Sequence, residues 1–512
     1  MGCTDAPTCS LPRVSKFRFF HSQTFNWCIL CFGALLRIAQ FIYNRSLTEG
    51  EAALALNIIN KSYADLLQPL DFAQAAPVGF LISQRFMISI LGNTEMTLRM
   101  IPLIAALASL ILFLDVAKRI LKPTALTIGL ILFAVGDHLI YFASEVKQYS
   151  TDVFWALCII LLALWLLKHK NSLVPVIIYS LVSAFSLWFS HPVLFVISTC
   201  SLVIVIVLIK QRSWPVLARF LIIMIVPCAS FALHYMLVLA AAARNQELIA
   251  FWQPAFMPLP PASFKDLTWY PYVFLRTFKF PIGFSVYTLG LAVISFIFGF
   301  LTMLRTRKRL LAMVLFPVLI TLIVSGMYKY PFEGRLILFL TPLFIIIIAE
   351  GLDFLREGVA RYHFPSSIFV VLVLLLYPVG HSWYRLIVPR APEELRPIMQ
   401  YVSAHKRSSD EIYLYYASAH AYRYYAPRFG FDPDIQPGVE ARNDWTHYYT
   451  DIEQYTGKGR VWFLFSHIAT TYGVDEEKLF VSYLTASGEQ LDYFSAPGAA
   501  AYLYDMTSLS RQ

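Results

Sequence analysis

Two acidic side chains stand close together just after the first long apolar run of the chain. Glu49 and Glu51 lie within residues 44–58, where they precede a stretch of alanine and leucine. Carboxylates at the start of an amphipathic helix, just beyond a membrane face, can accept a proton or bind a metal ion. The same acids would also favour the positive N-terminal end of that helix. The spacing alone leaves both interpretations open.

Two further segments carry polar groups beside apolar runs. Residues 68–80 contain Asp71 and Gln74 ahead of a short apolar run, although Asp71 is also a common turn residue before a helix. Residues 328–338 contain Arg335 at the start of a long apolar run. An arginine in that position either extends its head to lipid headgroups or holds a phosphate through charge-assisted contacts.

The loop at residues 141–152 joins two apolar runs and is rich in polar side chains. It contains Glu145, Lys147, Gln148 and Tyr149. A carboxylate and a lysine this close together can act on a proton and on a phosphate, respectively. We therefore include all four residues among the candidate site residues.

Ionisable residues also occur inside or at the ends of apolar runs. Asp137 and His138 lie within one run, and an ionisable group in a membrane span indicates a function by default because its burial is costly. Structural pairing of Asp137 with His138 or Lys147 is the equal alternative. His191 precedes Pro192, which is typical of a helix boundary. Asp137, His138 and His191 are kept as candidate substrate-binding residues.

The composition of the chain is that of a membrane protein. Of its 512 residues, 58% are hydrophobic and 14% are charged, against about 25% charged in soluble domains. Apolar runs of about 17–25 residues can cross a bilayer as helices. We count about eleven such runs, at residues 26–43, 99–117, 124–144, 153–167, 173–190, 192–209, 216–240, 285–304, 310–327, 336–352 and 366–380. The sequence therefore predicts a mainly α, polytopic membrane protein.

The orientation follows from one further apolar run, residues 77–91, which is short and contains Gln84 and Arg85. If this run lies at the interface, the basic clusters all fall on one face, as the positive-inside rule requires. These clusters are Arg13/Lys16/Arg18, Lys118/Arg119/Lys122, Lys168/Lys170, Lys210/Arg212/Arg219, Arg305/Arg307/Lys308/Arg309 and Arg356/Arg361. We expect a basic cytoplasmic tail at residues 1–25, a transmembrane domain at 26–384, and a first outer loop at 44–98 with two interfacial helices.

The last span would deliver the C-terminal part of the chain to that outer face. From residue 385 to 512, acids, tyrosine, proline and glycine appear at frequencies typical of soluble domains. Helical and strand-like segments alternate there, at residues 392–405 and 411–416, in a short helix that ends at residue 425, and at residues 460–465, 475–486, 491–494 and 500–504. We expect a small extracytoplasmic α/β domain. The formal charge of +9 then reflects the basic cytoplasmic loops and tail, and so it indicates the orientation of the chain in the membrane. Nucleic acid is therefore excluded as a partner.

In these segments the chain resembles the GT-C superfamily of membrane glycosyltransferases, in particular its PMT-related, RgtA/B/C/D-like bacterial branch. Residues 46–58 resemble the first-loop segment SLW-x-DEA of that family. Further similar segments are residues 69–80, 98–102, 144–149, 330–338, 393–397, 460–467 and 496–498. The order of these segments carries the resemblance, which extends along nearly the whole chain.

The resemblance implies transfer of a sugar from a polyprenyl-phosphate donor to a glycan, lipid or protein acceptor on the outer face of the inner (cell) membrane. One departure matters, because Gly50 stands where the family has an aspartate ahead of Glu51. An inverting single displacement needs an activated nucleophile, a stabilised phosphate and close positioning. As a hypothesis, Glu51 or Glu49 accepts the proton, and Glu145 positions the acceptor or a metal.

In the same hypothesis, Lys147 and Arg335 neutralise the departing phosphate, while Gln148 and Tyr149 line the cavity. Two or three carboxylates would suit a hard divalent cation such as Mg²⁺ or Mn²⁺, and the sequence leaves metal dependence open. Two alternatives remain: a transporter or flippase for lipid-linked saccharides, and a non-catalytic relative that binds lipid-phosphate sugar. Gly50 keeps the second of these open, whereas no inverted repeat supports the first.

Overall fold

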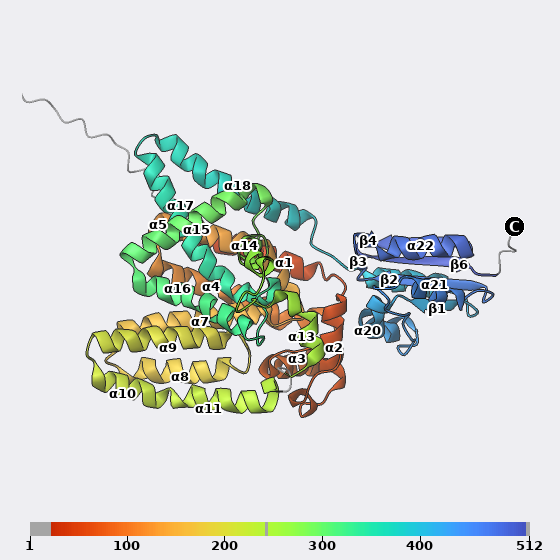
Figure 1. Ribbon diagram of the computed structural model, residues 1–512, viewed down its shortest axis with the longest axis horizontal. Helices are drawn as coiled ribbons and strands as arrows, with labels where there is room; N and C mark the ends of the chain where they lie inside the picture. The colour runs from red at the N-terminus through yellow and green to blue at the C-terminus, as the bar shows by residue number, and fades with distance from the viewer. Residues whose placement is uncertain (1–21, 241–243, 508–512) are drawn as a thin grey trace, which may run out of the picture.

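The computed structural model describes residues 22–240 and 244–507. Figure 1 shows a bundle of long helices and a smaller α/β domain, which are joined by helix α18 (Phe364–Ile387). The end of α18 lies close to the domain boundary expected at residue 385. The basic residues predicted for the N-terminal tail, Arg13, Lys16 and Arg18, lie outside the described residues.

Within the described ranges, nine helical segments are long and apolar enough to cross a membrane. They are α1 (Gln23–Ile42), α4 (Glu95–Ile120), α7 (Tyr149–Lys168), α9 (Val193–Lys210), α10 with α11 (Trp214–Ile223, Ile225–His234), α15 (Val286–Thr306), α16 (Lys308–Gly326), η5 with α17 (Gly334–Leu340, Thr341–Ala360) and α18. A tenth candidate consists of α5 (Pro123–Val135) followed by α6 (Asp137–Tyr141) and η2 (Phe142–Ser144), with a bend of 51°.

Each of the eleven predicted apolar runs is helical, but two of them differ from a simple crossing helix. The predicted span at residues 124–144 is broken at Gly136, where α5 ends and α6 begins. The predicted span at residues 173–190 contains α8 (Leu173–Ser186), which has only 14 residues. The expected count of about eleven therefore becomes nine, or ten if the bent pair is one span.

Helix α17 forms the centre of the bundle, and its residues 341–353 are all buried. It packs against α15 through two glycines. A Cβ atom on Gly351 would lie 1.7 Å from the carbonyl oxygen of Ser295, and one on Gly299 would lie 1.9 Å from that of Ile347. Because these distances are too short for a side chain, no larger residue fits at this crossing. Such close approach of two backbones is typical of helices that associate in lipid.

The first outer loop contains α2 (Glu49–Asn60), η1 (Asp65–Leu67) and α3 (Val78–Leu91), in agreement with the prediction of two helices. Helix α2 is more enclosed than an interfacial helix would be. Its residues 51–58 are all buried, and it packs against α3 and against α20 (Ala419–Phe429) of the C-terminal domain. The C-terminal domain therefore forms part of the cover of this loop.

A second outer segment, between α11 and α15, was not predicted. It contains α13 (Gln246–Phe251), η4 (Gln253–Ala255) and α14 (Phe264–Lys279). Prolines interrupt this segment repeatedly, at positions 254, 258, 260, 261 and 271. Because each helix is short or contains a proline, no long periodic pattern marks them in the sequence.

The C-terminal domain is α/β, as predicted. Its four-stranded sheet has the order β1-β2-β6-β5, in which β1 and β2 are parallel and the other pairs antiparallel. The strands are β1 (Glu411–Leu414), β2 (Arg460–Ser466), β5 (Glu489–Ala496) and β6 (Ala499–Asp505). Helices α19 (Leu395–His405), α20, α21 (Thr446–Glu453) and α22 (Glu476–Ser487) accompany it, together with a small hairpin of β3 (Thr470–Thr471) and β4 (Val474–Asp475).

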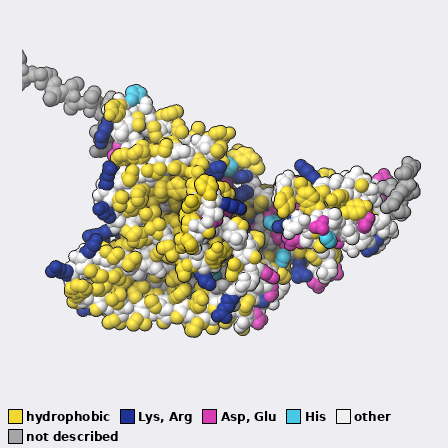
Figure 2. Space-filling view, viewed as in Figure 1, with side chains coloured by type: hydrophobic (Ala, Val, Ile, Leu, Met, Phe, Trp, Pro, Cys, Tyr) yellow, Lys and Arg dark blue, Asp and Glu magenta, His cyan; other side chains and the backbone are white. Residues whose placement is uncertain are grey.

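Charged side chains divide between the two ends of the molecule. Figure 2 shows lysine and arginine gathered along the edge of the helical part that lies away from the α/β domain, with hydrophobic surface between. Acidic and histidine side chains appear at the junction with that domain. The candidate acids therefore lie at the end of the bundle opposite to the basic loops.

Candidate active site

Glu51 is the centre of a fully buried ion cluster. Its carboxylate pairs with Arg45 and also accepts hydrogen bonds from Arg99, with Nε and Nη2 both 3.1 Å away. The backbone N–H of Thr48 donates to it at 3.0 Å, which completes a capping box with the Thr48 side chain at the start of α2. The backbone N–H of Val146 donates to it at 2.8 Å.

These contacts fix the protonation state of Glu51. Burial raises the pKa of this carboxyl, but Arg45 and Arg99 outweigh burial and lower the pKa to about 2. Both carboxylate oxygens are saturated with donors, so the group is a poor proton acceptor at neutral pH. Its geometry instead supports a structural role, because the bond to Val146 positions the loop that carries Glu145.

Glu145 has the opposite surroundings. Its side chain is buried, and Oε2 has no hydrogen-bond partner within the described part of the chain. Burial and the nearby charge of Glu51 raise its pKa to about 7, against the opposing effect of Arg335, Arg45 and Lys147. The group is therefore ready to bind a partner that the protein itself does not supply.

Lys147 lies two residues further along the same loop and is also buried. Its Nζ donates to Oε1 of Gln74 at 2.6 Å, which joins two of the predicted site segments. Burial and the nearby Arg335 lower its pKa to about 7, although Glu145 opposes this shift. Apart from Gln74, no side chain among residues 22–240 and 244–507 forms a hydrogen bond or ion pair with its ammonium group.

Arg335 lies between two aromatic rings. Its guanidinium carbon is 5.9 Å from the ring centroid of Tyr149 and 5.7 Å from that of Trp252. Within the described ranges, no carboxylate lies within ion-pair distance of Arg335. The nearby acid Glu333 pairs with Arg276 instead. Such a cation, held by aromatic faces and not neutralised, can receive an anion.

Glu49 does not join these groups but points to the C-terminal domain. It pairs with Nδ1 of His420 and accepts the backbone N–H groups of His420 and Ala421, both at 2.9 Å. A second pair lies alongside, in which Glu393 binds Nδ1 of His467 at 2.8 Å and the backbone N–H of Glu49 at 2.8 Å. Two carboxylate–histidine pairs thus occupy the junction of the two parts.

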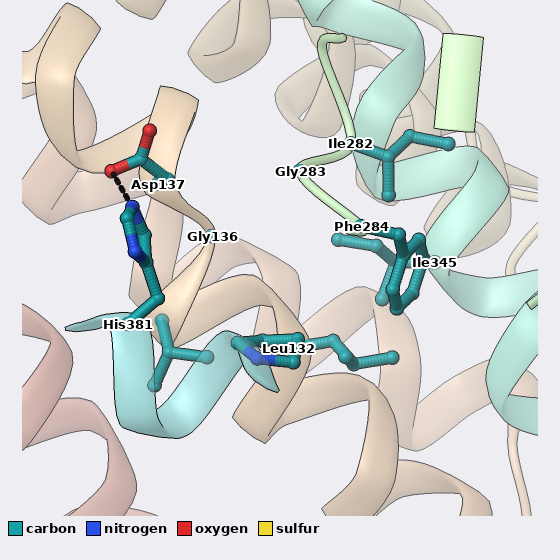
Figure 3. A pocket seen from close by; sticks show the side chains of 10 residues that line it. Leu132, Gly136, Asp137, Ile282, Gly283, Phe284, Ile345 and His381 are labelled. Carbon is teal, nitrogen blue, oxygen red and sulfur yellow. Dashed lines mark ion pairs between the residues drawn. The ribbon is translucent and has the colours of Figure 1, made fainter. Parts of the chain in front are cut away.

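Asp137 forms a separate ion cluster beside a small pocket that is shown in Figure 3. It pairs with His381 at 3.3 Å, Arg385 at 3.4 Å and Arg390 at 3.2 Å. The predicted alternative, pairing with His138 or Lys147, is therefore replaced by partners on α18 and the linker that follows it. Because both arginines come after residue 380, no local pattern indicated this contact. The cluster anchors the link to the C-terminal domain.

The remaining predicted residues lie apart from Glu145. The His138 ring packs against Phe280, with centroids 4.3 Å apart, and His191 faces His234 with centroids 5.5 Å apart. Asp71 is exposed and pairs with Lys61 at 3.1 Å. In contrast, Gln148 follows Lys147 directly, and its Oε1 is buried without a partner within the described part of the chain.

The donor set does not fit a metal ion held by several carboxylates. Glu49 and Glu51 are each committed to nitrogen donors, so that of these three acids Glu145 alone has a buried oxygen without a partner among the described residues. Among the described residues, no group of three or more His, Cys, Asp or Glu side chains could hold a metal ion. A requirement for Mg²⁺ or Mn²⁺ stays a prediction.

Four residues of this region were not identified as site residues from the sequence: Arg45, Arg99, Trp252 and His420. A signal existed for the arginines, because Arg45 and Arg99 each lie at an outer end of a predicted span, beside an acid that needs compensation. Trp252 and His420 had no such signal. They come from segments that lie far from Arg335 and Glu49 along the chain.

Comparison with known proteins rests on structure, because no protein-family model and no curated protein sequence matches the chain. ArnT from Cupriavidus metallidurans in the apo state is similar with a TM-score of 0.51 and 13% identity, over 94% of this chain and 98% of that one. ArnT bound to undecaprenyl phosphate gives a TM-score of 0.52, 12% identity and the same coverage.

The apo oligosaccharyltransferase of Archaeoglobus fulgidus gives a TM-score of 0.51 and 9% identity, over 94% of this chain and 74% of that one. At such identities the likeness concerns the fold. It extends over both the helical bundle and the C-terminal domain, because 94% of this chain is covered. The chain therefore shares the fold of these solved structures.

Proposed function

We propose that this protein transfers a sugar from a polyprenyl-phosphate donor to an acceptor at the outer face of the membrane. The observation that carries the proposal is the pair Lys147 and Arg335, two cations without a carboxylate within ion-pair distance in the described ranges, beside Glu145 with its free oxygen. A phosphate would supply the missing negative charge. The structure of ArnT with bound undecaprenyl phosphate, which has a similar fold, supports a polyprenyl phosphate as the carrier.

The charges of the site change together when a phosphate binds. An anion beside Lys147 raises the pKa of its ammonium group above about 7, so that the lysine becomes fully charged. The same anion raises the pKa of Glu145 further, so that this group becomes a neutral carboxylic acid. In that form Glu145 can donate a hydrogen bond to the bound donor, whereas the sequence hypothesis gave it the acceptor or a metal to position.

The reaction is a single displacement with inversion. The acceptor oxygen forms a bond to the anomeric carbon, and the bond from that carbon to the phosphate oxygen breaks with its electron pair. Lys147 and Arg335 stabilise the negative charge that develops on the leaving phosphate. We place the basic loops in the cytoplasm and the C-terminal domain outside, because this arrangement satisfies the positive-inside rule.

The test uses the purified full chain, radiolabelled polyprenyl-phosphate sugars and envelope acceptors, with and without a chelator. Lys147→Met and Arg335→Gln should each lower transfer by about 10²–10³-fold, because each removes charge stabilisation of the leaving group. Lys458→Met is the matched control, since Lys458 pairs with Glu411 on the exposed surface of the C-terminal domain. Wild-type protein that leaves the label on the lipid with every common sugar would overturn the proposal.

A further inference from the structure

The geometry of His420 gives its ring a defined proton arrangement. Its Nδ1 faces the carboxylate of Glu49, so Nδ1 carries the hydrogen and Nε2 keeps its lone pair. The same carboxylate accepts the backbone N–H groups of His420 and Ala421, which fixes the ring to the start of α20. A carboxylate that orients one nitrogen of an imidazole prepares the other to accept a proton.

The other nitrogen is free. Nε2 has no hydrogen-bond partner in the part of the chain that the structure describes, and 29% of the His420 side chain is exposed. The edge of Phe72 packs against the ring with centroids 4.4 Å apart. The imidazole is therefore fixed in place but open to a molecule from outside.

One turn connects this histidine to the proposed phosphate site. The carbonyl oxygen of Phe72 accepts a hydrogen bond from Nε2 of Gln74 at 3.0 Å, and Oε1 of Gln74 accepts one from Lys147 at 2.6 Å. The Phe72 side chain thus contacts His420, and the Gln74 side chain contacts Lys147. The same turn therefore contacts both His420 and the lysine that would hold the leaving phosphate.

Space for a ligand is also present at the start of α2. A Cβ atom on Gly50 would meet no heavy atom within 4 Å, although this residue lies between Glu49 and the buried Glu51. In the first turn of α2, the side chains of Glu49 and Glu51 therefore contact other residues, whereas the space beside Gly50 is open. A glycine here leaves room for an acceptor, and equally for a carboxylate introduced by substitution.

We propose that His420 is the general base of the transfer reaction and that Glu49 is the residue that positions it. The inference rests on the proposed function. Nε2 of His420 takes the proton of the acceptor hydroxyl while the acceptor oxygen bonds to the anomeric carbon and the phosphate leaves with the electron pair. Glu49 stabilises the resulting imidazolium, and the proton then passes to solvent.

Other candidates for the base are less suitable. Glu51 is saturated by two arginines and two backbone N–H groups, and Glu145 lies beside the cations that would hold the phosphate. The groups that face His420 are Glu49 from α2 and the neighbouring pair of Glu393 and His467. This second pair provides a matched control, because it lies at the same junction and has the same chemistry.

The first test compares transfer by His420→Gln, Glu49→Gln and His467→Gln, together with binding of undecaprenyl phosphate by each variant. His420→Gln should lower transfer by about 10²–10⁴-fold and Glu49→Gln by about 10²-fold, with carrier binding retained. His467→Gln should stay within about twofold of wild type. The losses in His420→Gln and Glu49→Gln should appear in kcat, whereas the apparent KM for the donor should stay close to that of the wild type.

The second test uses the open space at Gly50. Adding Gly50→Asp to His420→Gln should restore part of the lost transfer, because the new carboxylate fits without displacing a neighbour. The proposal is overturned if His420→Gln transfers at the wild-type rate, or if it loses carrier binding together with transfer, which would indicate a structural role. Failure of the wild type to transfer any sugar would instead overturn the proposed function itself.

Discussion

The acids Glu51 and Glu145 lie in adjoining clusters that differ in one physical property. The Glu51 cluster is closed: two arginines and two backbone N–H groups satisfy one carboxylate, and all members are buried. The Glu145 cluster is open: one carboxylate oxygen has no partner in the described ranges, and Lys147 is held only by an amide. Val146, whose N–H binds Glu51, directly connects the two clusters.

The difference separates structural acids from functional ones. A buried charge that is fully paired contributes to a fixed geometry, whereas a buried polar atom without a partner is costly and persists where a ligand can satisfy it. Pairing also explains the opposite pKa shifts, to about 2 for Glu51 and to about 7 for Glu145. The acid that most resembles a family motif is thus the one least able to accept a proton.

The largest effect is expected from breaking the closed cluster. Glu51→Gln leaves Arg45 and Arg99 buried without their counter-charge, which should lower the free energy of unfolding by about 3–5 kcal/mol. Denaturant titration of the detergent-solubilised protein measures this change. Glu411→Gln, which breaks an exposed pair with Lys458, should cost less than about 1 kcal/mol. A stable Glu51→Gln protein with a hundredfold loss of transfer would restore Glu51 as the base.

A smaller effect is expected from Glu145→Gln, and it depends on pH. The pKa of Glu145 is raised in the folded protein to about 7, so wild-type stability is highest in acid and falls as the pH rises from about 5 to 7. The variant lacks this titration. Its free energy of unfolding relative to wild type, measured by denaturant titration, should therefore increase between pH 5 and pH 8 by about 1–3 kcal/mol.

An equal difference between the two proteins at every pH from 5 to 8 would contradict the raised pKa of Glu145. Glu411→Gln serves as a control for removal of a carboxyl group. Glu411 is an exposed acid of the C-terminal domain that pairs with Lys458 at 3.0 Å and belongs to neither cluster.

The smallest effect is expected from Gln74→Leu, which removes the hydrogen bond to Lys147 but no charge. One such bond to a charged group contributes about 1.5–3 kcal/mol, and a bound phosphate replaces part of it. We expect a rise in the apparent KM for the donor of about threefold to tenfold, with kcat little changed, measured by steady-state transfer. A hundredfold loss of kcat would place Gln74 itself in contact with the reacting groups.

Much of the fold was predictable because lipid imposes strong rules on the sequence. The eleven apolar runs are all helical, and the elements at residues 460–465 and 475–486 correspond to β2 and α22. The break at Gly136 and the short α8 were not predicted, since apolar composition does not record where a helix bends. The segment around Trp252 was not predicted either, because its prolines leave no long periodic pattern in the sequence.

The candidate site was predictable only in part. Lys147 and Gln74, which the structure brings into contact, were both predicted as site residues, as were Glu145 and Arg335, because polar residues beside membrane spans are rare. Their division of roles was not, because it depends on which partners each acid meets. Glu49 and Glu51 lie two positions apart, yet one meets His420 from the distant C-terminal domain and the other meets two arginines.

The sequence by itself determined that this protein is a polytopic helical bundle with an α/β domain, and it indicated the loops that carry the candidate site residues. These properties follow from local hydrophobicity and charge, which each segment carries alone. Only the tertiary structure decided which acid is saturated, which is free and which holds a histidine. The pKa of a buried group depends on its burial and its neighbours, and for Glu145 those neighbours include Arg335, which lies far away along the chain.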